Sequence, residues 1–209
     1  VLQSDDLQAL IASPYHRAPQ LGWRGQRDWD WRADATPISM QFETELNHFK
    51  LPGNDAPAAA GSPPRIEGSR WHMLVAAEQR WRWPGAWLTP RAKLNLAHYK
   101  TDEPMTDGRR TASRAIPTIS IDGGFIFERN TSWRGRPLRQ TLEPHLLYVN
   151  TPFRNQLTLP LFDSAAKDFN TISVFSDSAF TGVDRVADAH QITLGATSRM
   201  LEPDTGAEA

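Results

Sequence analysis

The residues of this chain best suited to chemistry are charged side chains that alternate with apolar ones. Glu43 and Glu45 lie in one such stretch, Arg80 lies in the next, and Arg91 and Lys93 lie in the one after it. Opposite charges that face each other on neighbouring strands pair across a sheet. We therefore predict that these five side chains form one polar surface, which faces a partner protein or a folded-in loop.

A second charged group occurs late in the chain, at Asp184, Arg185 and Asp188. These residues could bind a cation or a sugar phosphate. They could equally hold a long loop in place through charge-assisted hydrogen bonds. We favour the loop-anchoring interpretation.

Neither a catalytic nor a metal-binding motif is present in the sequence. The histidines are scattered and lack the H-E-x-x-H spacing of a zinc site, and no G-x-S-x-G nucleophile elbow occurs. A Ser/His hydrolase site would have to use Ser120 or Ser198 with a distant histidine, which is the weaker interpretation. Without cysteines, neither a disulfide nor a thiolate metal site can form. The sequence therefore predicts no enzyme, no cofactor and no metal.

The element that must position these residues is clearest at 70–83. Every second residue there is mostly apolar, with Trp71, Trp81 and Trp83 at the ends, and the residues between are mostly polar. Period two indicates an extended strand with two unlike faces. Ten residues separate Trp71 from Trp81, which is roughly 33 Å along a strand and about 25 Å when tilted, the height of the lipid-facing band of an outer-membrane barrel. We interpret the three tryptophans as membrane-interface side chains rather than a sugar-stacking platform.

The same alternation predicts seven strands, joined by connections that are short and long in turn. Three connections are long, at 51–68, 101–111 and 151–190. This pattern is typical of an up-and-down barrel, with short turns on the periplasmic side and long loops outside. We predict an all-β, antiparallel transmembrane β-barrel segment, incomplete by itself, within a single barrel domain that includes all of 1–209. The predicted strands are 20–31, 38–49, 70–83, 87–99, 114–129, 141–150 and 191–201.

Composition agrees with this interpretation. The formal net charge of −1 argues against nucleic acid as a partner. No run approaches eighteen apolar residues, so no membrane-spanning helix is predicted. Because the chain begins with Val1 and ends soon after an apparent strand, we expect it to be a piece of a longer protein.

Two stretches resemble a known family. The run Gln140–Val149, QTLEPHLLYV, and the residues Pro152–Gln156 that follow are similar to the family's QTLEPRLQYLYVPYRNQ. The run Gly182–Gly195, GVDRVADAHQITLG, with Ser198 and Arg199, resembles G-x-D-R-x-x-D-A-N-Q-x-T-x-G-x-x-S-R, with a histidine at His190 where the family often has Asn. On these motifs the chain is identified as a member of the LptD (OstA/Imp) family of outer-membrane lipopolysaccharide-assembly proteins.

The resemblance implies a central segment of a very large barrel in the outer membrane of a Gram-negative bacterium. Proteins of this family hold the lipoprotein LptE as a plug in the lumen. They receive lipopolysaccharide from a periplasmic LptA bridge through an N-terminal jelly-roll domain, and insert it into the outer leaflet through a lateral gate. Neither the jelly roll nor the gate strands lie in this chain, so the resemblance implies no gating residue here.

Two other interpretations remain open at this stage. One is a soluble or surface Trp-rich β-domain that binds carbohydrate, and the weaker one is a fragment of a porin-type barrel. A soluble domain would stay monomeric without detergent, whereas a barrel segment would not.

Overall fold

The structure is a computed structural model, and it describes residues 15–32, 35–52, 65–164 and 182–208. Among the described residues, no helix is both long and apolar enough to cross a membrane. The elements are all strands: β1 (His16–Trp29), β2 (Ile38–Lys50), β3 (Gly68–Gln79), β4 (Trp81–Trp83), β5 (Ala86–Thr101), β6 (Thr111–Phe125), β7 (Phe127–Trp133), β8 (Arg136–Thr151) and β9 (Ala189–Leu201).

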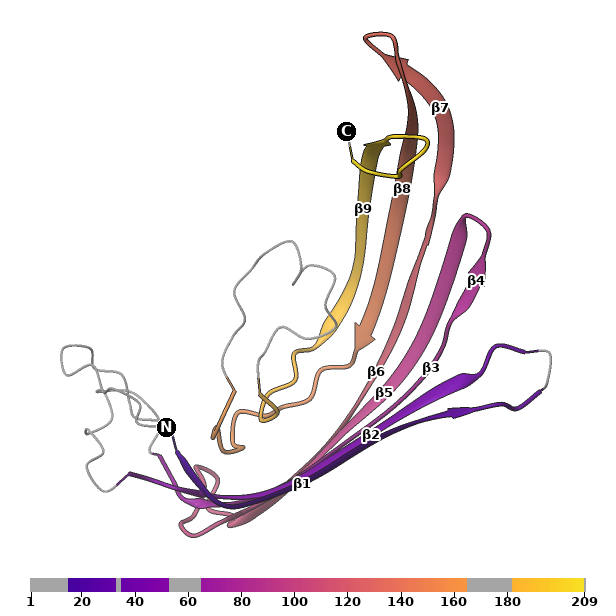
Figure 1. Cartoon of the computed structure of the whole chain (residues 1–209). Coiled ribbons are helices and arrows are strands. Elements are labelled where there is room, and N and C mark those ends of the chain that lie inside the picture. The colour runs from indigo at the N-terminus through magenta and orange to yellow at the C-terminus, as the bar shows by residue number, and fades with distance from the viewer. Residues whose placement is uncertain (1–14, 33–34, 53–64, 165–181, 209) are drawn as a thin grey trace, which may run out of the picture.

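The nine strands form one antiparallel sheet, in the order β1-β2-β3-β5-β6-β8-β7, with β4 paired to β5 and β9 paired to β8. Figure 1 shows the sheet as a single, strongly curved layer in which neighbours along the chain lie side by side. The two ends of the sheet do not meet, so the sheet stays open. The predicted all-β antiparallel fold is confirmed, and an open curved sheet is consistent with an incomplete barrel segment.

Two predicted strands, 70–83 and 114–129, are each divided in the structure. The first breaks at Arg80, yet β3 and β4 keep one register against β5, since Glu78 faces Arg91 and Trp81 faces Leu88. The second breaks at Ile126, whose N–H donates to the Gly85 carbonyl at 2.7 Å. There β6 and β7 also keep one register against β8. The nine strands therefore run as seven continuous lines.

The tight turns have the residues that their geometry demands. Pro84 and Gly85 link β4 to β5, and Gly85 has a φ of 77°, as expected for Pro-Gly at the centre of a type II turn. Arg134 and Gly135 link β7 to β8 with φ values of 50° and 79°, the positive pair of a type I′ hairpin. These compact turns let pairing continue to the hairpin ends, so β8 begins at Arg136 rather than at the predicted residue 141.

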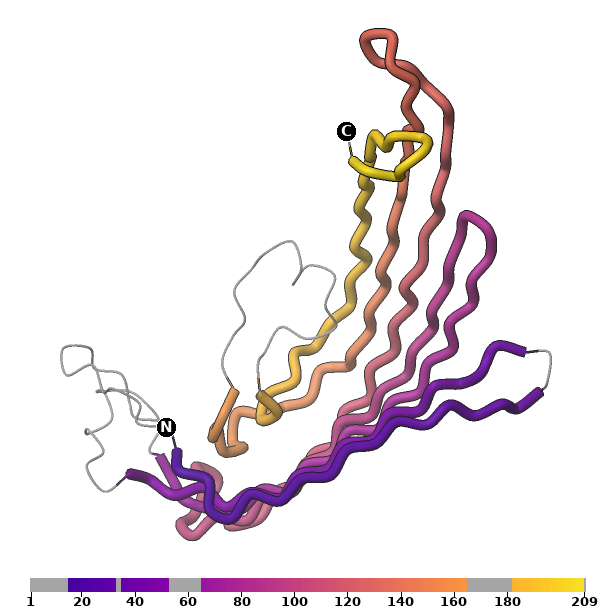
Figure 2. Tube along the Cα trace, in the orientation of Figure 1, coloured from indigo at the N-terminus to yellow at the C-terminus, as the bar shows by residue number. Residues whose placement is uncertain are grey.

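The long connections lie at the other end of the strands. The loop predicted at 101–111 is shorter, because Thr101 and Thr111 still pair within β5 and β6. After β8 the chain turns onto the concave side of the sheet, as Figure 2 shows for the residues that follow Thr151. There Leu159 and Phe162 pack with Phe49 and Tyr99 of the sheet, and Met105 from the connection between β5 and β6 joins the same cluster.

Side chains alternate between the two faces of the sheet, and the faces differ sharply. The concave face carries Arg70, Tyr99 and Arg114, which contact the segment after β8. The convex face carries apolar rows, such as Val75 opposite Leu94. No second layer covers the convex face within the described part of the chain, so large apolar side chains there are exposed, among them Trp71, Leu94, Ile119, Phe125, Ile192 and Leu194.

Candidate functional site

The best-defined polar site lies where the segment after β8 meets the concave face, and Arg70 is at its centre. The Arg70 side chain is completely buried. Its two terminal nitrogens donate to the two Asp163 carboxylate oxygens, Nη1 to Oδ1 at 2.8 Å and Nη2 to Oδ2 at 2.7 Å. Nη1 also donates to Oδ1 of Asp184 at 2.6 Å. One strand arginine is thus held by two carboxylates from opposite ends of the 151–190 connection.

Asp184 is also completely buried, and it collects donors from three directions. Besides Arg70, the Tyr99 hydroxyl lies 3.3 Å from Oδ1. The backbone N–H groups of Phe162 and Asp163 each donate to Oδ2 at 2.7 Å. The carboxylate therefore joins the two arms of the connection to each other as well as to the sheet.

Burial would raise the pKa of Asp163, but the hydrogen bonds and charge of Arg70 outweigh burial and lower it to about 2. Burial raises the pKa of Asp184, against the opposing charge of Arg70. Of the two carboxyl groups, Asp163 is therefore the one that Arg70 holds most firmly as an anion.

An aromatic group packs beside the ions. The rings of Phe49 and Phe162 stack with centroids 4.2 Å apart and planes 2° apart. Tyr15 meets the edge of each ring, and the Arg70 guanidinium lies 4.9 Å from the Phe49 centroid. Phe162 therefore buries the ion pairs from the loop side, and this exclusion of water strengthens them.

Arg114 and Gln156 form a second set of contacts between the sheet and the 151–190 connection. Arg114 on β6 donates to Oε1 of Gln156 at 2.7 Å and also to the Val183 carbonyl. The Gln156 amide binds the backbone of Val186 through both its nitrogen and its oxygen. Hydrogen bonds therefore join the residues just after β8 to the residues just before β9, on the concave side of the sheet.

The start of the returning arm depends on a glycine. Gly182 has a φ of 68°, and a Cβ there would lie 2.3 Å from the Asp163 carbonyl oxygen. Slightly further along the same arm, the N–H groups of Asp184 and Arg185 donate to the Ser164 hydroxyl at 2.7 and 3.1 Å. Close approach of the two arms therefore requires the absence of a side chain at 182.

Ion pairs and hydrogen bonds at this site hold the 151–190 connection against the sheet. Within the described residues, no three histidine, cysteine, aspartate or glutamate side chains gather so as to hold a metal ion. The two carboxylates are instead saturated by donors from the protein itself. The arrangement fixes a loop against the inside of a curved wall.

Of the predicted charge cluster, Asp184 and Arg185 lie in the site around Arg70, and Asp188 does not. Asp184 contacts Arg70, and Arg185 donates to the carbonyls of Leu159 and Pro160 at 2.8 and 3.2 Å. Asp188 is exposed and lies outside the site. The loop-anchoring role assigned to the three residues remains a prediction.

The predicted pairing of the strand charges is wrong in its partners. The register sets Glu43 opposite Leu74 and Glu45 opposite His72, so neither glutamate faces an arginine on β3. The carboxylate that contacts Arg80 and Arg91 is Glu78, which lies on the same line of chain as Arg80. Lys93 faces Ala76 on one side and Thr118 on the other. All of these side chains occupy the concave register.

The predicted interface tryptophans lie on the convex face. Trp71 is 41% exposed and donates from its indole nitrogen to the Thr44 hydroxyl at 2.9 Å. Trp81 is half-buried and Trp83 is 54% exposed, next to the turn that follows β4. The three rings lie at different heights of the sheet, because positions 71, 81 and 83 follow one another along a single line of strand.

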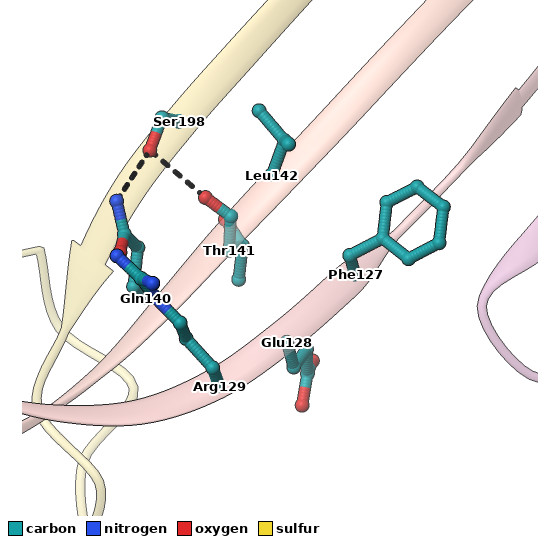
Figure 3. A pocket seen from close by; sticks show the side chains of 7 residues that line it. All are labelled: Phe127, Glu128, Arg129, Gln140, Thr141, Leu142 and Ser198. Atoms are coloured by element: carbon teal, nitrogen blue, oxygen red, sulfur yellow. Dashed lines mark hydrogen bonds between the residues drawn. The ribbon is translucent and has the colours of Figure 1, made fainter.

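Ser198, one of the two serines considered for a hydrolase, lines a shallow depression of roughly 300 Å³ near the turn end of β7 to β9. Figure 3 shows its hydroxyl between Gln140 and Thr141. The hydroxyl donates to the Thr141 carbonyl at 3.0 Å and accepts from Gln140 at 3.2 Å. The seven residues that line the depression include no histidine. Ser198 here serves to join β9 to β8.

Sequence reasoning missed the central residues of the site. Arg70 lies in the polar row of 70–83, for which the sequence predicts no partner residue on the 151–190 connection, and Gln156 enters only at the end of a family motif. The available signal was the position of Arg70 and Arg114 near the loop ends of their strands, on the same face as the expected lumen. An arginine at such a position needs a nearby anion or carbonyl, and the loop after β8 is long enough to supply it.

Comparison with known proteins decides the family. The family model described as LptD: LPS transport system D matches residues 3–209. The chain belongs to the LptD family. LPS-assembly protein LptD of Acidovorax sp. (strain JS42) is 39% identical over 204 residues, which are 98% of this chain and 24% of that protein. The proteins of the same name from Ralstonia nicotianae and Alkalilimnicola ehrlichii are 36% and 37% identical, over 23% and 25% of their lengths. The chain thus spans about a quarter of these LptD proteins.

Replacing Arg70 tests the anchor. In Arg70→Met the stem remains but both carboxylates lose their cation, and removing one partner of a buried ion pair costs about 3–5 kcal/mol. We expect the N–H groups of Phe162, Asp163 and Asp184 to lose most of their protection in hydrogen exchange of the full-length protein in detergent.

Arg109→Met is the matched control, because Arg109 is exposed and pairs with Asp107 within its own loop. Unchanged protection in Arg70→Met would contradict the anchoring role. Equal loss in both variants would mean that the effect is not specific to this site.

Proposed function

We propose that this chain is one continuous arc of the barrel domain of an LptD protein, and that the whole protein inserts lipopolysaccharide into the outer leaflet of the outer membrane. The observation that carries the proposal is the family match over 3–209, to which the sheet adds a physical basis. A single curved layer with one apolar and one polar face suits a wall between lipid and water. The carbohydrate-binding and porin alternatives gain no support from the family match.

The proposed orientation follows from the two faces. Rows such as Phe42, Val75 and Leu94 meet acyl chains on the convex side, and the concave ionic rows line a water-filled lumen. The compact turns at Pro84–Gly85 and Arg134–Gly135 lie on the periplasmic side, and the long connections lie on the outer side, as in other outer-membrane barrels. In this orientation Arg70, Asp163 and Asp184 anchor a loop inside the outer mouth of the barrel.

The partners of the whole protein are also proposals. LptE occupies the lumen and contacts the concave polar face at residues such as Glu43, Arg80 and Arg91. The periplasmic LptA bridge meets an N-terminal domain outside this chain. The protein uses neither a cofactor nor nucleic acid, and it acts by position and selective contact with no covalent step.

Depletion of the full-length protein tests the function. We expect surface lipopolysaccharide, measured by labelling of intact cells, to fall as the protein is depleted, and to recover when a plasmid copy is expressed. Unchanged surface lipopolysaccharide at full depletion would refute the proposal.

Arginine substitution tests the orientation. Leu94→Arg places a charge near the middle of the convex face, where it should cost about 2–4 kcal/mol if that face meets lipid. Leu74→Arg, at the same level but on the concave face opposite Glu43, should cost under about 1 kcal/mol, because the new charge faces a carboxylate in the polar lumen. The measurement is urea unfolding of the full-length protein from lipid vesicles, and equal costs at the two sites would exclude a lipid-facing convex surface.

Photo-crosslinking tests the partner. A photoreactive residue at Glu43, Arg80 or Arg91 should crosslink to LptE in the assembled complex, because these positions face the proposed lumen. The same residue at Val75 or Leu94 is the control and should give no such product. Silence at all three concave positions would count against a plug at this arc of the wall.

A further inference from the structure

The hairpin formed by β7 and β8 projects beyond its neighbours at the turn end of the sheet. The β4–β5 hairpin turns at Gly85, whose carbonyl accepts the N–H of Ile126. From there β7 continues for the seven residues of Phe127–Trp133, roughly 23 Å along a strand. On the other side, the first residue of β8 that pairs with β9 is Arg139. Figures 1 and 2 show the hairpin extending past the strands on both sides of it.

One edge of β7 is open. In the part of the chain that the structure describes, β7 pairs with β8 and with no other strand. Successive N–H groups of a strand point to opposite edges, and the N–H of Ile126 points toward Gly85, away from β8. The N–H and carbonyl groups of every second residue after Ile126 therefore point to the same open edge. These residues are Glu128, Asn130 and Ser132.

The other edge of the hairpin is closed by a proline. Pro137 on β8 lies opposite Ser132. Residues opposite each other in an antiparallel pair direct their backbone groups either both inward or both outward, so the nitrogen of Pro137 points outward. Proline has no N–H to offer to a further strand, and proteins use it to protect strand edges. β7 contains no proline, so the sequence blocks one edge of the hairpin and leaves the other able to pair.

Both faces of the projecting hairpin are uncovered. Every residue of β7 is exposed apart from Thr131, which is partly exposed. A two-stranded ribbon without a covering layer is marginally stable in water. A third strand on the β7 edge would add backbone hydrogen bonds and would cover part of the Trp133 ring, which is 64% exposed. The hairpin therefore gains stability from an added strand.

The hairpin carries an excess of positive charge. Its one carboxylate is that of Glu128, which pairs with Arg139 at 3.8 Å. In the part of the chain that the structure describes, Arg129, Arg134 and Arg136 form no ion pair. A strand with carboxylates is therefore favoured on this edge, and a basic strand is repelled. The same charge disfavours pairing between two copies of this hairpin.

A membrane surface suits the tip of the hairpin less well than a protein does. In the proposed orientation, the turn between β4 and β5 lies at the periplasmic surface of the membrane. A strand tilted by about 40° projects about 18 Å along the membrane normal over the length of β7. The headgroup region on one side of a bilayer is only roughly 5–8 Å deep. The tip of the hairpin therefore extends past the headgroups into the periplasm.

We propose that the open β7 edge binds an extended, acidic segment of a periplasmic protein, which joins the sheet as a further strand. This inference rests on the proposed function, because that function places the hairpin in the periplasm. The backbone groups of Glu128, Asn130 and Ser132 supply the hydrogen bonds, as in other cases of strand addition. Arg129 and Arg134 supply the preference for acidic side chains. The projecting hairpin thus holds a periplasmic protein at the rim of the barrel.

Hydrogen exchange of the full-length protein in detergent, resolved to single amides, tests the edge. The probe is a synthetic peptide of alternating valine and aspartate, and the control peptide has lysine in place of aspartate. At a peptide concentration about ten times the dissociation constant, exchange at Asn130 and Ser132 should slow roughly tenfold, because only the unoccupied edge exchanges. Exchange at Thr131 and Trp133, which bond to β8, should not change. No slowing with the acidic peptide, or equal slowing with the basic one, would overturn the proposal.

Asn130→Pro and Asn130→Ala form a matched pair of variants. Proline removes one outward N–H and leaves the bonds between β7 and β8 in place, whereas alanine keeps that N–H. We expect the acidic peptide to slow exchange at Ser132 in Asn130→Ala but not in Asn130→Pro. Protection of the Trp133 N–H in both variants shows that the hairpin is intact. Equal slowing at Ser132 in the two variants would contradict strand addition.

A charge variant tests the preference for acidic segments without touching the backbone. Arg129→Gln with Arg134→Gln should lose most of the slowing by the acidic peptide. Its control is Arg109→Gln with Arg154→Gln, which removes the same charge at the loop end and should behave like the unmodified protein. Equal slowing in the two double variants would exclude the arginines as the source of the preference.

Photo-crosslinking from Ser132 tests the site in cells. We expect an adduct with a protein segment that holds more aspartate and glutamate than lysine and arginine. The adduct should form in the Asn130→Ala background and be lost in the Asn130→Pro background. An adduct with lipid, an adduct with a second copy of this chain, or no adduct would overturn the proposal.

Cell-surface labelling separates this inference from the proposed function. If the unmodified protein restores surface lipopolysaccharide and the acidic peptide leaves exchange at the β7 edge unchanged, the inference fails alone. If the unmodified protein does not restore surface lipopolysaccharide, the proposed function fails, whatever the peptide result.

Discussion

Arg70 must share one guanidinium between two carboxylates from opposite ends of a long connection, and the shape of the concave face depends on this arrangement. A buried arginine without a counter-ion would be strongly unfavourable, and so would either carboxylate without the arginine. Asp163 and Asp184 must therefore both bind Arg70 in the folded protein. Their binding places Phe162, the neighbour of Asp163, against the ring of Phe49. The connection is thereby held against the sheet rather than left outside it.

The second constraint is the division of the sheet into unlike faces. Every acidic residue of the described strands points to the concave side, and the convex side is apolar with cations at its ends. In water the exposed convex rows would be an aggregation hazard. In a membrane they are the favourable contact, and the concave face supplies the polar lining. For the proposed role, the same pattern supplies a wall with apolar rows toward lipid and a polar lining toward water.

Period two in the sequence was enough to predict much of this. It locates the strands within a few residues, and it assigns Trp71 to one face and Glu43 and Arg91 to the other. The sequence Pro84–Gly85 is typical of a tight turn, and the alternation of short and long connections predicts a meander. These features are local, because backbone geometry makes successive side chains of a strand alternate whatever the strand pairs with. The motif around Asp184 identified the family for the same reason, since it is contiguous in the chain.

Pairing between distant residues was decided by the tertiary structure. Alternation tells which face a side chain occupies but not which residue lies opposite, so Glu43 and Glu45 were given the wrong partners and Glu78 was overlooked. Arg70 and Asp163 are 93 residues apart, and nothing local links them. Register depends on how the strands and their connections fit together, and that fit is a property of the folded sheet.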